Sequence, residues 1–201
     1  PGDCEVPFPS LAYHFKTRLE SIPTQSPYLF VDPVKRENWR RLFAAKATAS
    51  KRTTTSKRIG IVWQGNPKHR NDHNRSIPVG ALGDLLETPG FQFVGLQKDV
   101  AHIRVPDHIF DISALLSDFS ETAAAIEQLD LVITVDTAVA HLAGAIGRPV
   151  WTLLPYAPDW RWLLHREDSP WYPSMRLFRQ PIIGDWSSVV QAVRKGLLEL
   201  G

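Results

Sequence analysis

A pattern of strand, helix and strand between residues 131 and 155 constrains the fold of this chain more than any other feature. Residues 131–135 (LVITV) form a short apolar run rich in β-branched side chains, which is typical of a parallel strand buried on both faces. A helix is predicted at 137–146, because apolar side chains recur there at helical spacing, and a second strand at 150–154. Asp136 therefore lies at the carboxyl end of a strand, immediately before a helix.

The first turn of that helix predicts a ligand site. Its amide N–H groups have no acceptor within the helix, and the terminus carries about half a positive charge. Helix N-termini of this kind bind phosphate groups, and open α/β sheets bind their ligands at this edge. The pattern therefore favours a nucleotide or phosphosugar site.

Strands and helices alternate regularly from Arg58 onward. Strands are predicted at residues 59–63, 91–96, 108–112, 131–135, 150–154 and 175–178. Helices are predicted at residues 78–87, 120–129, 137–146, 159–164 and 186–198. Asp118 with Glu121 offers a capping-box-like start for the second of these helices. This alternation predicts an α/β fold, a Rossmann-like doubly wound parallel sheet of about six strands with right-handed crossovers and helices on both faces.

The composition narrows the class of protein. With 43% hydrophobic and 22% charged residues, the chain is typical of a soluble globular protein. A net charge of +2 is too small to indicate a nucleic-acid partner, and the single cysteine, Cys4, excludes an internal disulfide. No apolar run is long enough to span a membrane, so we expect a cytoplasmic location without a transmembrane segment. Because Met175 is the only methionine, we expect the chain to be part of a longer translation product.

The amino-terminal quarter differs from the rest. Residues 1–34 are rich in proline with short apolar patches, and look like the tail of another domain. A helix is predicted at 36–45. The polar, basic and Ser/Thr-rich residues 45–58 (AKATASKRTTTSKR) are interpreted as a solvated linker.

A basic loop at residues 64–77 (QGNPKHRNDHNRSI) is predicted to lie beside Asp136, because the strand-to-helix loops of a parallel sheet open on the same edge. Lys68 and Arg75 in this loop are suitable partners for a diphosphate, because each charge-assisted hydrogen bond to it would contribute about 1.5–3 kcal/mol. A merely solvated basic loop is the alternative. His69 and His73 lie four residues apart, but without a further ligand they predict no metal site.

Several segments of the sequence carry a family resemblance. DTAVAHLAGAIGRPVW resembles the D-S/T-G/A-x-x-H-x-A segment of the bacterial heptosyltransferases, glycosyltransferase family nine. Together with WQGNPKHRNDHNRSIP and PDWRWLLHREDSPWYPSMRLFRQ, it is still more similar to the carboxyl-terminal glycosyltransferase module of bacterial tetratricopeptide-repeat proteins. The resemblance covers about residues 10–201. It implies the GT-B fold, in which residues 57–201 form the nucleotide-sugar-binding Rossmann-like domain, and residues 1–56 are a remnant of the amino-terminal acceptor domain plus a linker.

The resemblance also implies roles for individual residues. Asp136 matches the family's aspartate at the sugar or phosphate, and Arg75 stands where heptosyltransferases place a lysine; these two are the candidate catalytic residues. Ala138 replaces the commoner glycine and still offers its amide. The candidate donor-binding residues are Thr137, Ala138, Val139, His141, Lys68, Asn66 and Gln97.

Alternatives stay open for several of these positions. Near a helix N-terminus His141 is expected to be neutral and to bind a ribose or phosphate, although it could simply pack against the sheet. Asp136 could serve only as a helix cap. Gln97 and Lys98 end the second strand and could reach a nucleotide. The aromatic segment 156–172 could fill the core or form a lid over the acceptor cleft.

These observations predict the donor-binding domain of a glycosyltransferase. A nucleoside-diphosphate sugar would be held at the Asp136–Thr137 helix terminus and by the loop from Lys68 to Arg75, with no cofactor and no metal. The acceptor, a lipopolysaccharide-type sugar or a protein, would meet the amino-terminal GT-B domain of the parent chain, which would also carry a repeat domain. A non-catalytic nucleotide-sugar-binding module and a nucleotide-sugar epimerase of the same fold are the alternatives.

Overall fold

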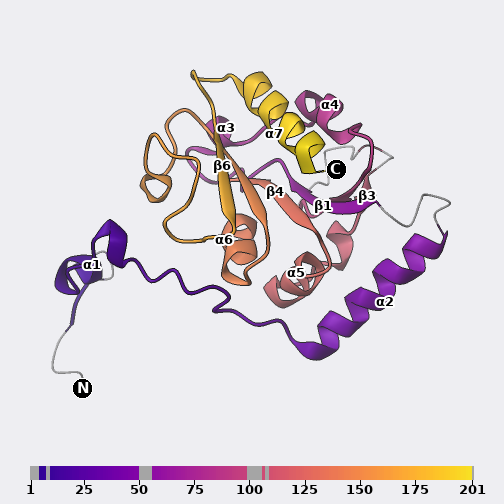
Figure 1. The fold of residues 1–201 in the computed structure, drawn as a ribbon, viewed down its shortest axis with the longest axis horizontal. Helices are drawn as coiled ribbons and strands as arrows, with labels where there is room; N and C mark the ends of the chain where they lie inside the picture. The colour runs from indigo at the N-terminus through magenta and orange to yellow at the C-terminus, as the bar shows by residue number, and fades with distance from the viewer. Residues whose placement is uncertain (1–4, 8–9, 50–55, 99–105, 107–108, 201) are drawn as a thin grey trace.

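A six-stranded parallel sheet forms the centre of the computed structural model, which describes all residues except 1–4, 8–9, 50–55, 99–105, 107–108 and 201 (Figure 1). Its strands follow the order β3-β2-β1-β4-β5-β6, and every pairing is parallel. They are β1 Lys57–Val62, β2 Phe91–Gly95, β3 Phe110–Asp111, β4 Leu131–Val135, β5 Val150–Leu154 and β6 Met175–Arg179. The predicted fold class is confirmed, and β4 and β5 have the bounds that were expected.

Helices cover both faces of the sheet (Figure 1). One face carries α5 (Phe119–Ile126) and α6 (Ala138–Ala145), and the other carries α4 (Gly83–Leu86) and α7 (Trp186–Leu200). Successive residues of β4 alternate between the two cores: Val132 faces α5 and α6, whereas Ile133 faces α4 and α7. The continuous apolar strands are thus explained by burial on both faces.

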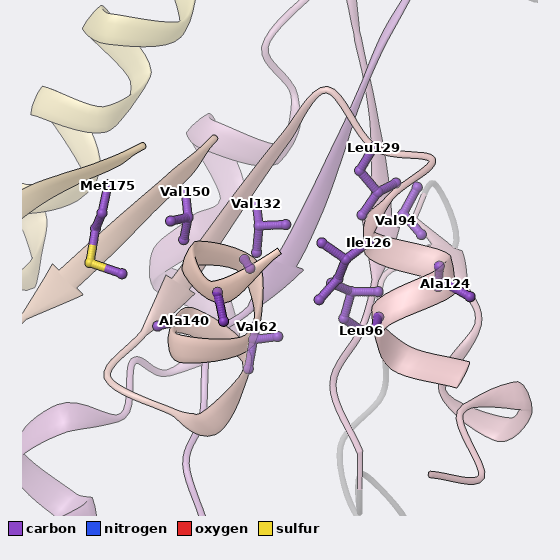
Figure 2. Close-up of a cluster of buried hydrophobic side chains, with 14 of the residues drawn as sticks. Val62, Val94, Leu96, Ala124, Ile126, Leu129, Val132, Ala140, Val150 and Met175 are labelled. Atoms are coloured by element: carbon purple, nitrogen blue, oxygen red, sulfur yellow. The ribbon is translucent and has the colours of Figure 1, made fainter. Parts of the chain in front are cut away.

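The core on the α5 and α6 face is assembled from several strands at once. Figure 2 shows aliphatic side chains of the central strands packed around Ala140 of α6 and Ile126 of α5. Both of these residues are fully buried. Small side chains along α6 bring its backbone close to the sheet, which fixes where the first turn of this helix lies.

The segment before the sheet packs against the same face. Helix α2 (Pro33–Ala49) lies beside α5, where Trp39 Nε1 donates to Glu121 Oε2 at 2.7 Å. Phe43 is buried in the core shared with α5 and α6. Upstream, Tyr28 and Leu29 donate their amides to the carbonyl of Ala145. By contrast, the short helix α1 (Leu11–His14) lies away from the sheet (Figure 1), with η2 (Leu19–Ser21) following it in the chain.

Several predicted element boundaries were wrong. Helix α2 continues to Ala49, so the first residues of the expected linker are helical; residues 50–55 lie outside the described part. The helix expected at 78–87 is a 3-10 turn, η3 (Val79–Leu82), followed by the short α4, and Pro78 precedes it. The helix expected at 159–164 is the single 3-10 turn η5 (Trp160–Trp162).

Two further expectations were only partly met. The third strand is reduced to Phe110–Asp111, with η4 (Ser113–Leu115) after it; residues 107 and 108 lie outside the described part. Asp118 does cap α5, accepting from the amide of Glu121 at 2.7 Å. The side chain of Glu121, however, binds Trp39 instead of completing a capping box. Within the described ranges, no helix is both long and apolar enough to cross a membrane.

Candidate functional site

The candidate site lies at the carboxyl ends of β1 and β4, the two central strands of the sheet. The chain proceeds from β1 outward to β2 and β3, and from β4 outward to β5 and β6, so the strand order reverses between them. In open α/β sheets this switch point leaves a crevice in which ligands bind. The loop after β1 and the first turn of α6 both open into it, as the sequence predicted.

Arg75 joins these two segments. Its Nη1 donates to the carbonyl oxygen of Asp136 at 3.0 Å, and its Nε donates to Asp72 Oδ1 at 3.0 Å. Asp72 is buried and also accepts from the hydroxyl of Ser76 at 3.0 Å, while that hydroxyl accepts from the amide of Gly65. The guanidinium is therefore held in a fixed orientation beside the end of β4.

Gly65 is required by this arrangement. A Cβ at this position would lie 2.3 Å from Asp72 Oδ1 and 2.6 Å from an Arg75 guanidinium nitrogen. Any other residue would push the ion pair out of place. The loop backbone and the Asp72–Arg75 pair are thus packed as one unit. Asp72 and Arg75 both belong to the short helix α3 (Asp72–Arg75), which the sequence had suggested to be loop.

The first turn of α6 offers amide donors to the crevice. Thr137 is the N-cap in an extended conformation, and its side chain caps no amide. Its hydroxyl instead lies 3.0 Å from the hydroxyl of Thr134. The amides of Ala138 and Val139, at the first two helical positions, have no acceptor within the helix. The cap is Thr137 and not Asp136, so capping does not explain the aspartate.

Two cavities meet at this helix end. The polar cavity, of about 400 Å³, is lined mostly by polar and charged residues; the apolar cavity, of about 610 Å³, has a mainly apolar surface. Arg75, Thr137 and Ala138 line both. The polar cavity is further lined by residues that include His69, Asn71, Asp136, His141, Asp159 and Arg161. The apolar cavity is further lined by residues that include Val62, Asn66, Leu96, Gln97, Phe119 and Val139.

His141 lines the polar cavity and is held by aromatic neighbours. Its ring stacks on buried Trp162 at a centroid distance of 5.1 Å, and its Nδ1 lies 3.1 Å from the hydroxyl of Tyr172. Burial lowers the pKa of His141, and Arg161 lowers it further, against the opposing effect of Asp136. The neutral form is favoured as expected, but burial is the main cause.

Gln97 has a structural role that the sequence did not reveal. Its side-chain oxygen accepts from the amides of Trp63 and Gln64 at 3.1 and 2.9 Å, and its side-chain nitrogen donates to the carbonyls of Gln64 and Lys98. The side chain clamps the ends of β1 and β2 together. The backbone thus satisfies both ends of this amide, although the residue still lines the apolar cavity.

The remaining predicted residues contribute less to the two cavities. Asn66 accepts from the amide of Lys68 in a tight turn, and lines the apolar cavity. The side chain of Lys68 is exposed and lines neither cavity. His69 lies at the polar cavity without His73, and buried Asp72 is bound to Arg75 and Ser76.

Sequence reasoning did not assign roles to four residues of this site. Asp72 and Ser76 orient Arg75, and the i,i+3 spacing of Asp72 and Arg75 was the available signal. Asp159 and Arg161 line the polar cavity and form an ion pair at 2.8 Å. Their position within a segment of tryptophans had favoured a packing role. Within that segment Trp162 is buried, as a packing role requires, whereas Trp160 is 66% exposed.

Comparison with known proteins shows what this chain is similar to in sequence. The profile of glycosyltransferase family 9 (heptosyltransferase) matches residues 110–181, which include β4 and α6. Protein FlbA of Caulobacter vibrioides is 29% identical over 191 residues, which cover 89% of this chain and 30% of FlbA.

Solved structures share the fold at low sequence identity. A family 9 glycosyl transferase from Veillonella parvula superposes with a TM-score of 0.55 at 14% identity, covering 85% of this chain and 51% of that one. The E. coli ADP-heptose lps heptosyltransferase II gives a TM-score of 0.51 at 16% identity, covering 90% of this chain and 56% of that one. The chain thus spans about half the length of these structures and 30% of FlbA. The family 9 profile thus matches part of the chain, and the solved structures of family 9 and heptosyltransferase proteins share its fold.

Proposed function

We propose that this chain is the donor-binding part of a glycosyltransferase, and that it binds a nucleoside-diphosphate sugar at the first turn of α6. The observation that carries the proposal is the contact of Arg75 with the carbonyl of Asp136, which brings a fixed guanidinium beside the free amides of Ala138 and Val139. Oriented amides and a guanidinium together suit a diphosphate.

The two cavities suit the two ends of such a donor. The apolar cavity, with Phe119, Leu96 and Val139, offers a surface on which a base can stack. The polar cavity, with Asp136, His141 and Asp159, offers hydrogen-bonding groups for sugar hydroxyls. Because Arg75, Thr137 and Ala138 line both cavities, the diphosphate would lie between base and sugar, as it does in the donor itself.

The same groups would assist the chemical step. When the bond between sugar and phosphate breaks, the sugar becomes cation-like and the departing diphosphate gains negative charge. The amides of Ala138 and Val139 and the guanidinium of Arg75 would bind that charge more strongly in the transition state than in the ground state. Asp136 would lie on the sugar side, where a carboxylate favours the developing positive charge.

Acceptor binding and proton removal would be supplied by other parts of a longer parent chain. We propose a GT-B arrangement, in which an amino-terminal domain faces this crevice, with residues 1–56 belonging to its remnant and linker. The parent would further carry the repeat domain indicated by the sequence resemblance, and would act in the cytoplasm. The acceptor would be a lipopolysaccharide-type sugar or a protein. An ADP-linked sugar is the first donor to test, because a structural neighbour is an ADP-heptose heptosyltransferase.

Replacing Ala138 by proline tests the amide cradle directly. Proline removes the amide N–H at the first helical position, where it is well tolerated, and Thr137 already has the extended conformation that a following proline requires. In titration calorimetry, the Ala138→Pro variant should bind ADP about tenfold more weakly or worse, since a charge-assisted hydrogen bond contributes about 1.5–3 kcal/mol.

The matched control is Ala138→Gly, which keeps the amide and should retain binding to within about threefold, apart from the added flexibility of glycine. UDP and GDP serve as alternative ligands in the same titrations. Equal affinity of the proline and glycine variants, or no heat with any of the three nucleotides in the unmodified chain, would refute the proposed diphosphate site. A chain that binds nucleotide sugars but whose parent transfers no sugar would be the non-catalytic module instead.

A further inference from the structure

His141 can meet a ligand in two different ways, depending on which ring nitrogen carries its proton. A neutral imidazole donates from one nitrogen and accepts at the other, and the partner of one nitrogen sets the role of the other. In this structure Nδ1 is occupied by the hydroxyl of Tyr172 at 3.1 Å, while the ring lines the polar cavity. The direction of the Tyr172 hydrogen bond therefore determines what His141 offers to a ligand.

A second tyrosine indicates that direction. The hydroxyl of Tyr28 donates to the hydroxyl oxygen of Tyr172 at 3.4 Å. With its oxygen already accepting from Tyr28, the Tyr172 hydroxyl has its own proton available for His141 Nδ1. Burial raises the pKa of Tyr172, so this hydroxyl keeps its proton.

The geometry of the three rings is fixed by close packing. Tyr172 is only 8% exposed and lies against Gly144 of α6, where an added Cβ would come within 2.4 Å of the tyrosine ring. Its ring meets the imidazole of His141 edge-on, at a centroid distance of 5.7 Å. Trp162 stacks on the imidazole at 5.1 Å. His141 is therefore packed between two aromatic rings and cannot turn freely.

Tyr28 is anchored by backbone contacts with the same helix. The amide of Tyr28 donates to the carbonyl of Ala145 at 2.9 Å, and the hydroxyl of Ser26 donates to the carbonyl of Gly144 at 2.7 Å. These bonds attach residues 26–29, which precede the sheet, to the carboxyl-terminal end of α6. The segment before the sheet thus contacts the helix that carries His141.

We propose that Tyr28 and Tyr172 hold His141 as its Nε2–H tautomer, so that the histidine presents a hydrogen-bond donor to the polar cavity. The tautomer is a property of the free chain; what it donates to rests on the proposed function, and is an oxygen atom of the donor sugar or its phosphate. Tyr172 is then a positioning residue, acting on the ligand through His141. Because Tyr28 donates to Tyr172, the segment before the sheet also affects the tautomer of His141.

Nitrogen-15 NMR of the histidine side chains tests the tautomer without any ligand. Long-range proton–nitrogen correlation spectra distinguish a protonated from an unprotonated ring nitrogen, and the His141→Gln variant identifies the His141 signals. In the unmodified chain at a pH above 7, we expect Nε2 to be protonated and Nδ1 to be a hydrogen-bonded acceptor. A protonated Nδ1 would overturn the proposal.

The Tyr172→Phe variant removes the hydroxyl and keeps the packed ring. It should shift the His141 signals toward a mixture of the two tautomers, whereas Tyr156→Phe, at an exposed tyrosine, should leave them unchanged. Unchanged His141 signals in Tyr172→Phe would show that the tyrosine does not set the tautomer. Loss of folding is monitored by circular dichroism, and the Tyr28→Phe variant, at a half-exposed position, gives a milder test in the same direction.

Binding separates this proposal from the proposed function. Tyr172→Phe should weaken binding of an ADP-linked sugar by about threefold to tenfold, the range for one neutral hydrogen bond. If the unmodified chain shows the Nε2–H tautomer but binds no nucleotide, the proposed function fails and the tautomer assignment stands. If it binds nucleotide but shows the Nδ1–H tautomer, the tautomer assignment fails and the proposed function stands.

Discussion

Arg75 donates from Nη1 to the backbone carbonyl of Asp136 across 3.0 Å, and thereby connects the loop after β1 with the end of β4. These residues are separated by sixty-one positions in the chain. The contact explains how a basic loop and a helix N-terminus form one site, because the same guanidinium is anchored on its other side by buried Asp72. Changes at Arg75 should therefore affect both the loop and the ligand.

Replacing Arg75 by lysine should weaken nucleotide binding while keeping the positive charge. Lysine lacks the planar fork that bonds Asp72 and the Asp136 carbonyl together. We expect the affinity for ADP to be at least about tenfold lower, because one charge-assisted hydrogen bond is lost or poorly aligned. Titration calorimetry measures the change. Arg70→Lys is the control in the same loop, since Arg70 is exposed and lines neither cavity; a similar loss there would show that the effect is not specific to the guanidinium of Arg75.

Gly144→Ala should destabilise the chain by overpacking α6. The added Cβ would lie 2.4 to 2.9 Å from three atoms of buried Tyr172, and we expect a loss of about 1–3 kcal/mol in the free energy of unfolding. Gly83→Ala, also at a helical glycine but with open space around it, should be neutral or stabilising by up to about 1 kcal/mol. Urea denaturation compares the two, and equal effects would contradict the close approach.

Phe43→Ala tests whether α2 belongs to the folded unit. Phe43 is 2% exposed and meets Phe110 edge-on at 5.8 Å, so its removal should cost about 3–5 kcal/mol of unfolding free energy. The exposed Val34 of the same helix provides the control, because its replacement by alanine should change the stability little. A small effect at both positions would mean that the sheet folds without α2.

The lowered pKa of His141 predicts a loss of stability in mild acid. Because burial lowers this pKa in the folded chain, the unfolded chain binds the proton more readily. The contribution is fully present above the usual histidine pKa of about 6.5, and is lost as the pH falls below it. Unfolding free energies measured between pH 7.5 and roughly pH 5 should decrease with falling pH.

Substituting His141 by phenylalanine should flatten this dependence, whereas His165→Asn, at an exposed position, should leave the curve as it is. Carboxylates affect the unfolding free energy in a separate, lower pH range. The hydrogen bond from Arg40, followed by that from Arg41, lowers the pKa of Glu37 to about 2, so its effect appears only below about pH 4.5. A curve for the phenylalanine variant that parallels the unmodified chain would contradict the assignment to His141.

The parts of the fold that could be predicted are those encoded by neighbouring residues. The strand at Leu131–Val135 was placed at its observed bounds because burial on both faces requires a continuous apolar run. Parallel topology then placed the loop carrying Arg75 beside Asp136, since all such loops open at one edge. Neither step needed knowledge of distant contacts.

The parts that were missed depend on contacts far along the chain. Gln97 looked like a ligand-facing residue, but its amide binds the backbone of Trp63 and Gln64, in the loop that follows β1. Glu121 matched a capping box, but an indole from α2 captures its carboxylate. Helix α2 was ended too early because its last residues are polar, although alanine and lysine are strong helix formers. Local patterns cannot reveal such tertiary partners.

Two hollows share three residues, Arg75, Thr137 and Ala138, at the end of α6. A molecule that fills both must pass over that helix end and make its central contacts there. A free sugar or a free nucleoside would reach one side only, and would miss the contacts at the shared boundary. Under the proposed function, the backbone of α6 would select for a ligand with two dissimilar halves and an anionic middle, before any side chain distinguishes one base or sugar from another.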